Sequence, residues 1–175
     1  MTLALLTPRS SHPAVAALFE AYADDVWRVL RRFGLAPADA DDGLQQVFLV
    51  AARRCGDIEP GRERAFLCAV ASRVAARLRQ RRSTELSELM DLEEPEGESR
   101  PDVELERRRL CATLDRLLAR LEPALREVVV LTFCAGLARS EVAQVLGVPE
   151  GTVASRLRRA HHLLGVSLQR AGVAA

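Results

Sequence analysis

The stretch Ser140–Ala160, SEVAQVLGVPEGTVASRLRRA, has the pattern of two short helices joined by a tight turn. Gly147 supplies the permissive backbone that ends a first helix, and Pro149, with its fixed φ and no N–H, suits the first position of the next. On that second helix, apolar residues recur at steps of three and four and form one stripe that must face a core: Val153, Leu157, Ala160 and Leu164. The stretch therefore predicts a helix-turn-helix.

The opposite face of the second helix carries small residues near its start and guanidinium groups further along. Such a helix can lie close to base edges in the major groove while its arginines reach guanines or phosphates. We expect Ser155 and Arg158 to contact bases, within a DNA-binding set of Gly151, Thr152, Ser155, Arg156, Arg158 and Arg159. An ordinary helical hairpin with a solvated face is the alternative.

Charge divides the 175 residues into three parts. Residues 1–82 hold 13 arginines and 9 acidic residues, residues 83–106 hold one arginine and 10 acidic residues, and residues 107–175 hold 11 arginines and 5 acidic residues. Prolines and a glycine in the acidic part favour a chain without a packed core. We predict two small basic domains, 1–82 and 107–175, joined by a flexible acidic linker at 83–106.

The four cysteines form no CxxC pair, and the three histidines are not placed to complete a zinc site. We therefore expect no metal, no cofactor and four reduced thiols. The apolar run Leu3–Leu6 is very short, and no stretch approaches the roughly 20 apolar residues of a membrane span. These features predict a cytoplasmic protein without membrane insertion.

Helical periodicity accounts for the rest of the chain, and no strand pattern occurs, so we predict an all-α fold. In the first part we expect one helix from Pro13 to Phe33 closed by Gly34, and a second after Pro37, capped by Asp39 or a neighbouring acid and ended by Gly56. We expect a third to bury Phe66, Leu67, Val70, Val74 and Leu78. In the last part we expect packing helices with apolar stripes at Leu110–Leu121 and Leu125–Phe133, the latter opened by Pro123 and ended by Gly136.

The third helix ends in the run Arg77–Arg82, in which arginines crowd together. Such crowding repels itself unless a polyanion or nearby acids neutralise it, although a helix C-terminus also favours cations. Because the chain also carries a predicted helix-turn-helix, this second basic surface favours a nucleic-acid partner.

Two segments resemble a known family. The run Asp39–Phe48, DADDGLQQVF, is similar to the region-two pattern D-A-E-D-L-V-Q-E-V-F of bacterial RNA polymerase sigma factors of the extracytoplasmic-function (ECF) type. The run Gly147–Leu157, GVPEGTVASRL, resembles the region-four pattern G-V-P-x-G-T-V-K-S-R-L of the same family. The two motifs occur in the family's order, separated by a variable segment.

The resemblance implies a partner for each region. Region two of the family docks on the clamp helices of the largest polymerase subunit, and the matching positions are Asp41, Asp42, Gln45, Gln46 and Phe48. Region four docks on the flap of the second-largest subunit through an apolar surface. Many relatives are also held inactive by an anti-sigma factor, so such a partner is implied too.

The resemblance also implies two contacts with promoter DNA. The recognition helix reads the minus-thirty-five element, and the segment from Cys55 to Arg82 melts and holds the minus-ten element through Phe66, Arg73, Arg77, Arg81 and Arg82. This chain differs from the family pattern at three of these positions. Phe66 stands where the family usually has tryptophan, Arg73 where it usually has asparagine, and Arg77 where aspartate is common. Ala154 replaces a lysine that is a phosphate contact in the family, which predicts weaker and less salt-dependent binding to the minus-thirty-five element.

The resulting hypothesis is a sigma factor without catalytic residues that binds core RNA polymerase and directs initiation. A stand-alone helix-turn-helix regulator with a sensing or dimerising N-terminal lobe is the alternative. An enzyme acting on nucleic acid is disfavoured because Asp39, Asp41 and Asp42 are the only dense acids before the linker, and helical spacing scatters them. The acidic linker could imitate RNA phosphates in the polymerase or serve only as a spacer.

Overall fold

Helices account for nearly all of the computed structural model, which describes residues 12–86 and 112–170. The first range holds α1 (His12–Arg32), α2 (Pro37–Arg53), the short 3-10 helix η1 (Cys55–Asp57) and α3 (Glu63–Leu86). The second holds a helical stretch at 112–119, then α5 (Pro123–Val129), the π-helix η2 (Val130–Cys134), α6 (Arg139–Leu146) and α7 (Glu150–Arg170). Neither range contains a strand, and the predicted all-α class is confirmed.

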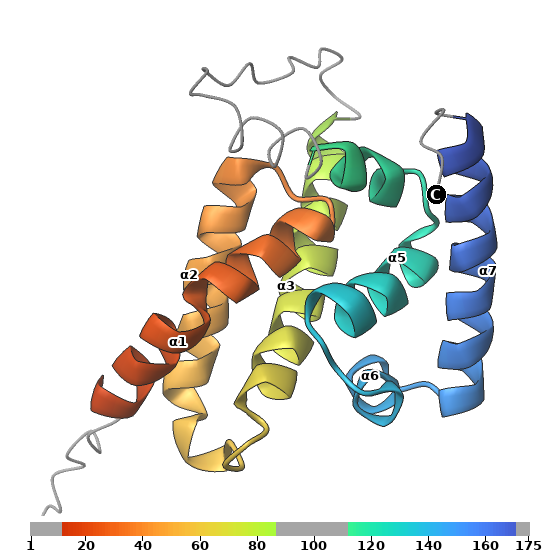
Figure 1. The fold of residues 1–175 in the computed structure, drawn as a ribbon. Coiled ribbons are helices and arrows are strands. Elements are labelled where there is room, and N and C mark those ends of the chain that lie inside the picture. Colours follow the sequence, from red (N-terminus) through yellow and green to blue (C-terminus); the bar gives the residue numbers. More distant parts are fainter. Residues whose placement is uncertain (1–11, 87–111, 171–175) are drawn as a thin grey trace, which may run out of the picture.

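The first lobe, residues 12–86, consists of α1, α2 and α3 (Figure 1). Its core includes Leu30, Phe33, Val47 and Leu67, each at most 1% exposed. Burial of such a side chain contributes about 1.5–3 kcal/mol. Gly43 lets α2 approach α1 closely, because a Cβ there would lie 3.3 Å from Leu30 Cδ1.

The second lobe, residues 112–170, packs α5 and α6 against α7 (Figure 1). Its core is formed by side chains with no exposed surface, namely Val128, Val130, Leu131, Val142, Val153 and Ala160. The apolar stripe predicted for the last helix is therefore confirmed as the face that α7 turns inward, with Leu157 and Leu164 half-buried against the same core.

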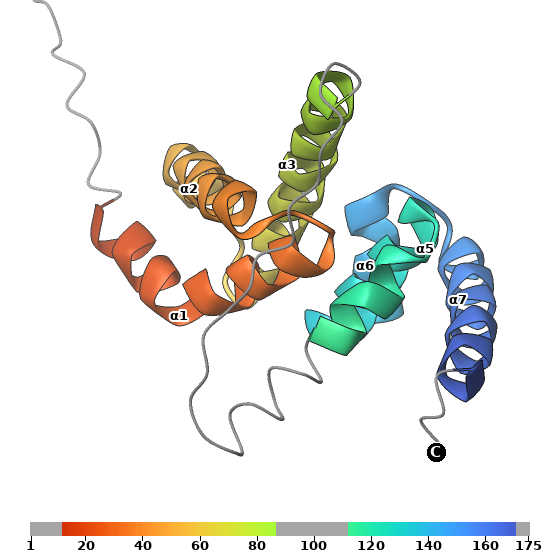
Figure 2. The same cartoon turned by 90° about the horizontal axis from the view of Figure 1, so that it is seen from above.

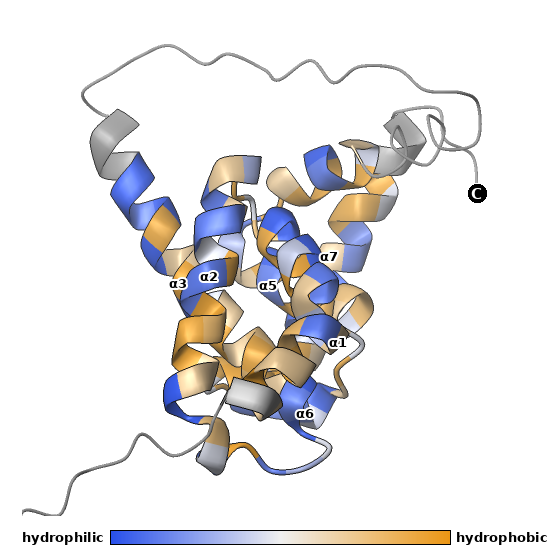
Figure 3. Ribbon diagram, turned by 90° about the vertical axis from the view of Figure 1, so that its left-hand side faces the viewer, coloured by the Kyte–Doolittle hydropathy of each residue, from blue (hydrophilic) through white to orange (hydrophobic). Residues whose placement is uncertain are grey.

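The two lobes lie directly against each other, with α3 beside α6 and α1 beside η2 (Figure 2). Their buried apolar residues form one continuous cluster. Figure 3 shows that the apolar residues concentrate where helices meet, whereas the coloured turns of α3 nearest its grey end are largely hydrophilic.

Several predicted helix ends are confirmed and others are shifted. Gly34 and Gly136 have φ values of 95° and 68°, the left-handed conformation expected after a helix end. Helix α2 instead ends at Arg53, before Gly56, and α3 continues to Leu86, four residues past the predicted domain end at 82. The rest of the predicted linker, with Leu110 and Cys111, lies outside the described residues.

Some predicted packing residues are less buried than expected. Phe66 and Leu78 are half-buried, and Phe133 is 73% exposed. Phe133 lies in η2, where the wider π-helical turn changes the direction of the side chains that follow Val130 and Leu131. A regular helical period assigned Phe133 to the core, and the wider turn accounts for the error.

Candidate nucleic-acid interface

The helix-turn-helix consists of α6, the turn at Gly147 and α7. Gly147 has φ 64° and ψ 35°, which confirms its predicted left-handed role at the end of α6. Pro149 precedes α7, and its carbonyl accepts hydrogen bonds from the backbone N–H groups of Thr152 (2.9 Å) and Val153 (3.2 Å). It therefore occupies the cap position, one residue earlier than predicted.

Helix α7 presents the predicted recognition face to solvent. Gly151, Ser155, Arg158 and Arg159 are exposed, whereas Thr152 and Arg156 are half-buried beside them. The Ser155 hydroxyl donates a hydrogen bond to the carbonyl oxygen of Thr152 (2.9 Å), which holds the side chain against the helix and leaves its oxygen as an acceptor. The face is free to meet a duplex, and its base contacts remain a prediction.

The second predicted surface follows α3, where Arg73, Arg77, Arg81 and Arg82 are all exposed. Arg77 Nη2 donates to Gln46 Oε1 (2.6 Å) and Arg82 Nη1 donates to Asp39 Oδ2 (2.5 Å). These bonds tie two of the arginines to α2, and Asp39 offsets the charge of one of them, Arg82. They also correct the capping role predicted for Asp39, because the N-cap of α2 is Ala36 and has no side-chain cap.

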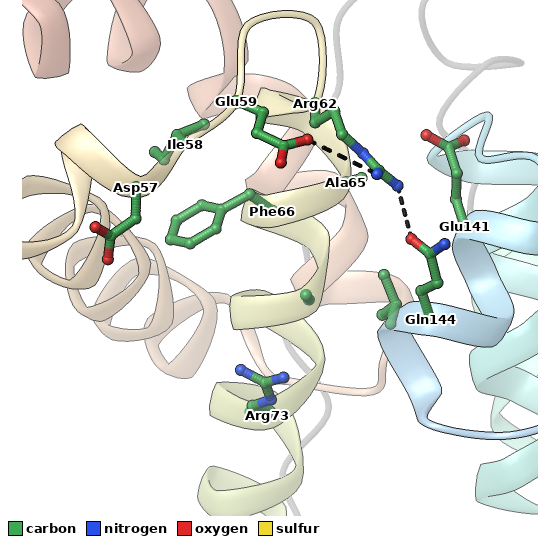
Figure 4. A pocket seen from close by; sticks show the side chains of 11 residues that line it. Asp57, Ile58, Glu59, Arg62, Ala65, Phe66, Arg73, Glu141 and Gln144 are labelled. Atoms are coloured by element: carbon green, nitrogen blue, oxygen red, sulfur yellow. Dashed lines mark hydrogen bonds and ion pairs between the residues drawn. The ribbon is translucent and has the colours of Figure 1, made fainter.

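Phe66 lies at the edge of a cavity of about 280 Å³ between α3 and α6. Figure 4 shows its ring turned toward Ile58 and Asp57, while Glu141 and Gln144 approach from α6. The Arg54 guanidinium lies 6.0 Å from the ring centroid and pairs with Asp57 (3.1 Å). The ring is thus half-buried beside a cation, an arrangement that suits stacking against a planar group.

Arg73 lines the same cavity as Phe66, so the structure brings these two predicted minus-ten residues together. Arg77, Arg81 and Arg82 lie further along α3 and do not line it. The predicted set therefore forms a track that runs from the cavity along the helix rather than a single pocket.

The predicted polymerase-binding residues lie on α2, but not all of them face outward. Asp41, Asp42 and Gln45 are exposed and Gln46 is half-buried, whereas Phe48 is only 6% exposed. The ring of Phe48 packs edge-on against Phe19, with centroids 4.9 Å apart. Phe48 is therefore a core residue of the first lobe, and its part in polymerase binding stays a prediction.

Leu49, which the sequence interpretation missed, is 57% exposed. It continues the stripe of Asp42, Gln45 and Gln46, because residues three, four and seven positions apart share one helix face. The signal was present, since the run Val47–Ala51 is apolar throughout and a helix can bury only one side of such a run. Asp41 is directed elsewhere, because its Oδ1 accepts a hydrogen bond from Trp27 Nε1 (2.8 Å).

A groove of about 600 Å³ lies between α1 and the second lobe. Its second-lobe wall includes Leu114, Leu118, Val129 and the exposed Phe133. Arg28 and Arg32 of α1 form the opposite wall. Of these four residues, Leu118 and Val129 belong to the core, whereas Phe133 is exposed and Leu114 is half-buried.

The described residues hold no group of three or more histidine, cysteine or acidic residues that could bind a metal ion. Asp39, Asp41 and Asp42 do not converge, because Asp39 pairs with Arg82 while Asp41 accepts from Trp27. Burial raises the pKa of the Cys68 thiol to about 12, and burial also raises the pKa of Cys134. These thiols are therefore protonated at neutral pH.

Comparison with known protein families matches residues 18–85 to sigma-70 region 2 and residues 111–161 to sigma-70 region 4. The ECF RNA polymerase sigma factor SigL of Mycobacterium tuberculosis is 32% identical over 169 residues, which covers 90% of each chain. The chain belongs to the ECF sigma factors. Sigma factors are non-enzymatic and direct transcription initiation, and the two matches in order do not favour the stand-alone regulator.

Other relatives agree with this assignment. RNA polymerase sigma factor CnrH of Cupriavidus metallidurans is 32% identical over 152 residues, covering 79% of this chain and 78% of CnrH. ECF sigma factor SigE of Mycolicibacterium smegmatis is 29% identical over 89% of this chain, which spans only 62% of SigE.

Solved structures share the fold. CnrH in complex with the cytosolic domain of CnrY superposes with a TM-score of 0.69 at 25% identity, covering 93% of this chain and 92% of CnrH. Bartonella quintana RpoE in complex with the anti-sigma factor NepR gives a TM-score of 0.71 at 17% identity, covering 88% of this chain and 96% of RpoE. Across the described ranges, none of the helices has the length and apolar character needed to cross a lipid bilayer.

Proposed function

We propose that this ECF sigma factor binds core RNA polymerase through both lobes, reads the minus-thirty-five element with α7 and opens the minus-ten element along α3. The observation that carries the proposal is the pair of arginine-bearing DNA surfaces on two separate lobes of one chain. Arg158 and Arg159 lie exposed on α7, and Arg73 and Arg81 lie exposed on α3.

On the first lobe, the stripe of Asp42, Gln45, Gln46 and Leu49 is the surface for the clamp helices of the largest subunit. An acidic and amide-bearing stripe with one large apolar residue suits a basic helical partner, because the charges orient the encounter and the apolar side chain loses water. Phe48, on the buried side of α2, packs against Phe19 and so helps to hold the helix that carries this stripe.

On the second lobe, Leu114 and Phe133 offer an apolar surface for the flap of the second-largest subunit. Phe133 is the stronger evidence for a partner surface, because a large apolar side chain that is 73% exposed on a lobe with a well-packed core favours a contact with another protein. The groove beside it has room for a helix or loop of that partner.

At the minus-ten element, Phe66 and Arg73 receive the first unstacked base, and the arginines that follow on α3 track the strand. Unstacking costs a few kcal/mol per step, and stacking on an aromatic side chain together with phosphate contacts offsets it. Phenylalanine offers a smaller stacking surface than the tryptophan usual at this position in the family, so promoter opening depends more on the arginines.

An anti-sigma factor is the proposed inhibitory partner, and the cytoplasm is the proposed location. Of the solved structures that share this fold, CnrH is in complex with the cytosolic domain of CnrY and RpoE is in complex with the anti-sigma factor NepR. The proposed domains are 1–82, 83–106 and 107–175, with the first extended by the end of α3 at Leu86.

Replacement of four glutamates tests the role of the acidic segment 83–106. If the segment follows the RNA path of the polymerase, replacing Glu93, Glu94, Glu96 and Glu98 by glutamine should change abortive initiation. If the segment is only a spacer, the same replacement should leave abortive initiation unchanged.

In vitro transcription tests the whole proposal. Core RNA polymerase with this chain, on a library of promoters from the source genome, should give transcripts whose start sites share two upstream elements. The double variant Arg158→Ala/Arg159→Ala should abolish selection of the upstream element. Arg116→Ala should leave it unchanged, because Arg116 is a surface arginine on another helical stretch, where it donates to nearby Thr113 (3.2 Å). Transcripts that start at the same sites without the chain would overturn the proposal.

A further inference from the structure

Two adjacent histidines lie on α7, one turn beyond the arginines of the recognition face. The chain has three histidines, His12, His161 and His162, and the last two belong to this helix. Both are exposed to solvent. Within residues 12–86 and 112–170, neither of the two makes a hydrogen bond or an ion pair. Their imidazole groups are therefore open to a ligand that approaches α7 from outside.

Helical spacing places only one of the two on the recognition face. Successive residues of an α-helix are turned by about 100°, so His162, seven positions after Ser155, lies within about 20° of the same line. Arg158 and Arg159 flank that line on its two sides. His161 is turned by about 100° from His162 and lies outside this face. The recognition face thus runs from small residues through two guanidinium groups to one imidazole.

The position of His162 along α7 fits the rim of a DNA groove. The first turns of a recognition helix contact base edges in the major groove. At about 1.5 Å per residue, His162 lies about 10.5 Å beyond Ser155 along the helix axis. The major groove is only about 12 Å wide and is bordered by phosphates, so a side chain that far from the base-contacting turns meets the backbone. An imidazole N–H can donate a hydrogen bond to a phosphate oxygen there.

The surroundings of His162 leave this approach open. Helix α7 forms the edge of the second lobe that faces away from the first, as Figures 1 and 2 show. Helices α5 and α6 pack against the apolar face of α7, on the side opposite His162. The charged residues of these two helices are Arg126, Glu127, Arg139 and Glu141. In the part of the chain that the structure describes, none of the four pairs with a histidine of α7, and on α7 itself the nearest charged groups are the two arginines one turn earlier.

We propose that His162 is a phosphate contact of the recognition helix, and that protonation of its imidazole strengthens this contact. The proposal rests on the proposed function, because it requires α7 to lie in the major groove. Histidine is the side chain whose charge ordinarily changes between pH 5 and 8. A neighbouring anion favours the charged imidazole, so DNA binding takes up a proton and becomes tighter as the pH falls. Helix α7 thus carries one cation that depends on pH beside its permanent ones.

Two measurable effects follow from such a contact. Uptake of one proton should tighten DNA binding about fivefold between pH 8 and pH 6. One further phosphate contact at the lower pH should also steepen the dependence of the logarithm of affinity on the logarithm of salt concentration by about 0.9. Both effects apply to every DNA sequence, because the phosphates are the same in all of them. The test therefore needs no known promoter.

Fluorescence anisotropy of the full-length chain on a rhodamine-labelled duplex of mixed sequence tests the proposal, at pH 6 and pH 8 and equal ionic strength. The wild type should bind about fivefold more tightly at pH 6. His162→Ala should lose this difference, whereas His161→Ala, its adjacent and equally exposed control, should keep it. His162→Arg should bind at pH 8 as tightly as the wild type binds at pH 6, since its charge is permanent.

The outcomes separate this proposal from the function on which it rests. The same response to pH in the wild type and in His162→Ala would overturn the role of His162, as would a response lost in His161→Ala instead. The double variant Arg158→Ala/Arg159→Ala on the same probe reports on the recognition helix itself. If that variant binds as tightly as the wild type, α7 is not the DNA-binding helix and the proposed function fails. If it binds weakly while the wild type shows no response to pH, only the role of His162 fails.

Discussion

The substitution Gly34→Ala should destabilise the protein more than a glycine replacement of the same backbone class elsewhere. Gly34 has φ 95°, where a residue with a Cβ is strained by about 1–2 kcal/mol. Its Cβ would lie 2.5 Å from Arg126 Nη1, so the guanidinium must move. An arginine side chain usually moves at little cost, but this one is held in place.

Arg126 is held by carbonyls of both lobes. It donates from Nε to Leu118 (2.8 Å), from Nη2 to Ala119 (2.7 Å) and Leu121 (3.2 Å), and from Nη1 to Phe33 (3.3 Å). Hydrogen bonds from a charged donor contribute about 1.5–3 kcal/mol each, and displacing the guanidinium weakens at least one. Together with the backbone strain, Gly34→Ala should cost about 3 kcal/mol.

Gly61→Ala is the matched control. Gly61 has φ 83° in the same lobe, and no atom lies within 4 Å of its added Cβ. Only the backbone strain applies there, so we expect about 1–2 kcal/mol. The difference between the two variants isolates the contact with Arg126.

Urea unfolding followed by the fluorescence of Trp27, the single tryptophan and a residue of the first lobe, measures both costs. A double-mutant cycle completes the test, since in an Arg126→Ala background the cost of Gly34→Ala should fall to the value of Gly61→Ala. Equal costs of Gly34→Ala in the two backgrounds would refute the steric argument.

Three further outcomes follow from the described side chains. Arg158→Ala should weaken binding to a cognate minus-thirty-five duplex by about 1–3 kcal/mol in a fluorescence-anisotropy titration, with a smaller loss on unrelated DNA; an equal loss on every sequence would reassign the residue to a phosphate. Asp42→Arg should weaken binding to core polymerase about tenfold in a titration while leaving the unfolding free energy unchanged, and undiminished binding would remove Asp42 from the clamp surface. Burial raises the pKa of Cys68 to about 12 from 9.0, so the folded state favours the protonated thiol. The free energy of unfolding that this contributes is retained below pH 9 and falls as the pH rises above it, by about 2 kcal/mol between pH 8 and 10.5. Urea unfolding of Cys68→Ala should lack this part of the loss, and the same dependence on pH in the variant and the wild type would contradict a raised pKa for Cys68.

Local sequence patterns predicted the helices and the recognition turn well. Gly147 and the stripe that includes Val153 and Ala160 were sufficient to predict the helix-turn-helix. A left-handed turn favours glycine, and a buried helix face needs apolar residues at steps of three and four. The same patterns failed where the helical geometry changes. Phe133 followed the expected period but lies on a π-helical turn that directs it outward.

The division of α2 between core and surface was only partly predictable. The family pattern singled out Phe48, but it does not say which members of a motif face a partner and which hold the helix in place. Burial distinguishes them, since Phe48 is 6% exposed and the adjacent Leu49 is 57% exposed. Packing against residues distant in the chain, among them Phe19, 29 residues earlier, buries Phe48, and no local pattern contains it.

The contacts between the lobes were not predictable from sequence at all, because they join residues that are far apart in the chain. Arg126 and Phe33 are 93 positions apart, and Arg64 and Ala135 are 71 apart. Their net charge gave no clue either, since two basic lobes would be expected to repel each other. The structure resolves the conflict locally, because the arginines between the lobes meet backbone carbonyls, Glu127 and Gln144.

All 25 lysine and arginine positions of the chain are arginine, and codon bias in the genome suffices to explain this. At the lobe interface, however, arginine in place of lysine has a physical consequence. Arg126 reaches four carbonyls through three nitrogens in a fixed plane, a geometry that the single ammonium of a lysine cannot reproduce. Burial lowers the pKa of Arg126, but a guanidinium starts so high that it stays charged, whereas a lysine at the same depth could release its proton. The same delocalised cation that suits phosphates on α3 and α7 therefore also suits the helix ends between the lobes.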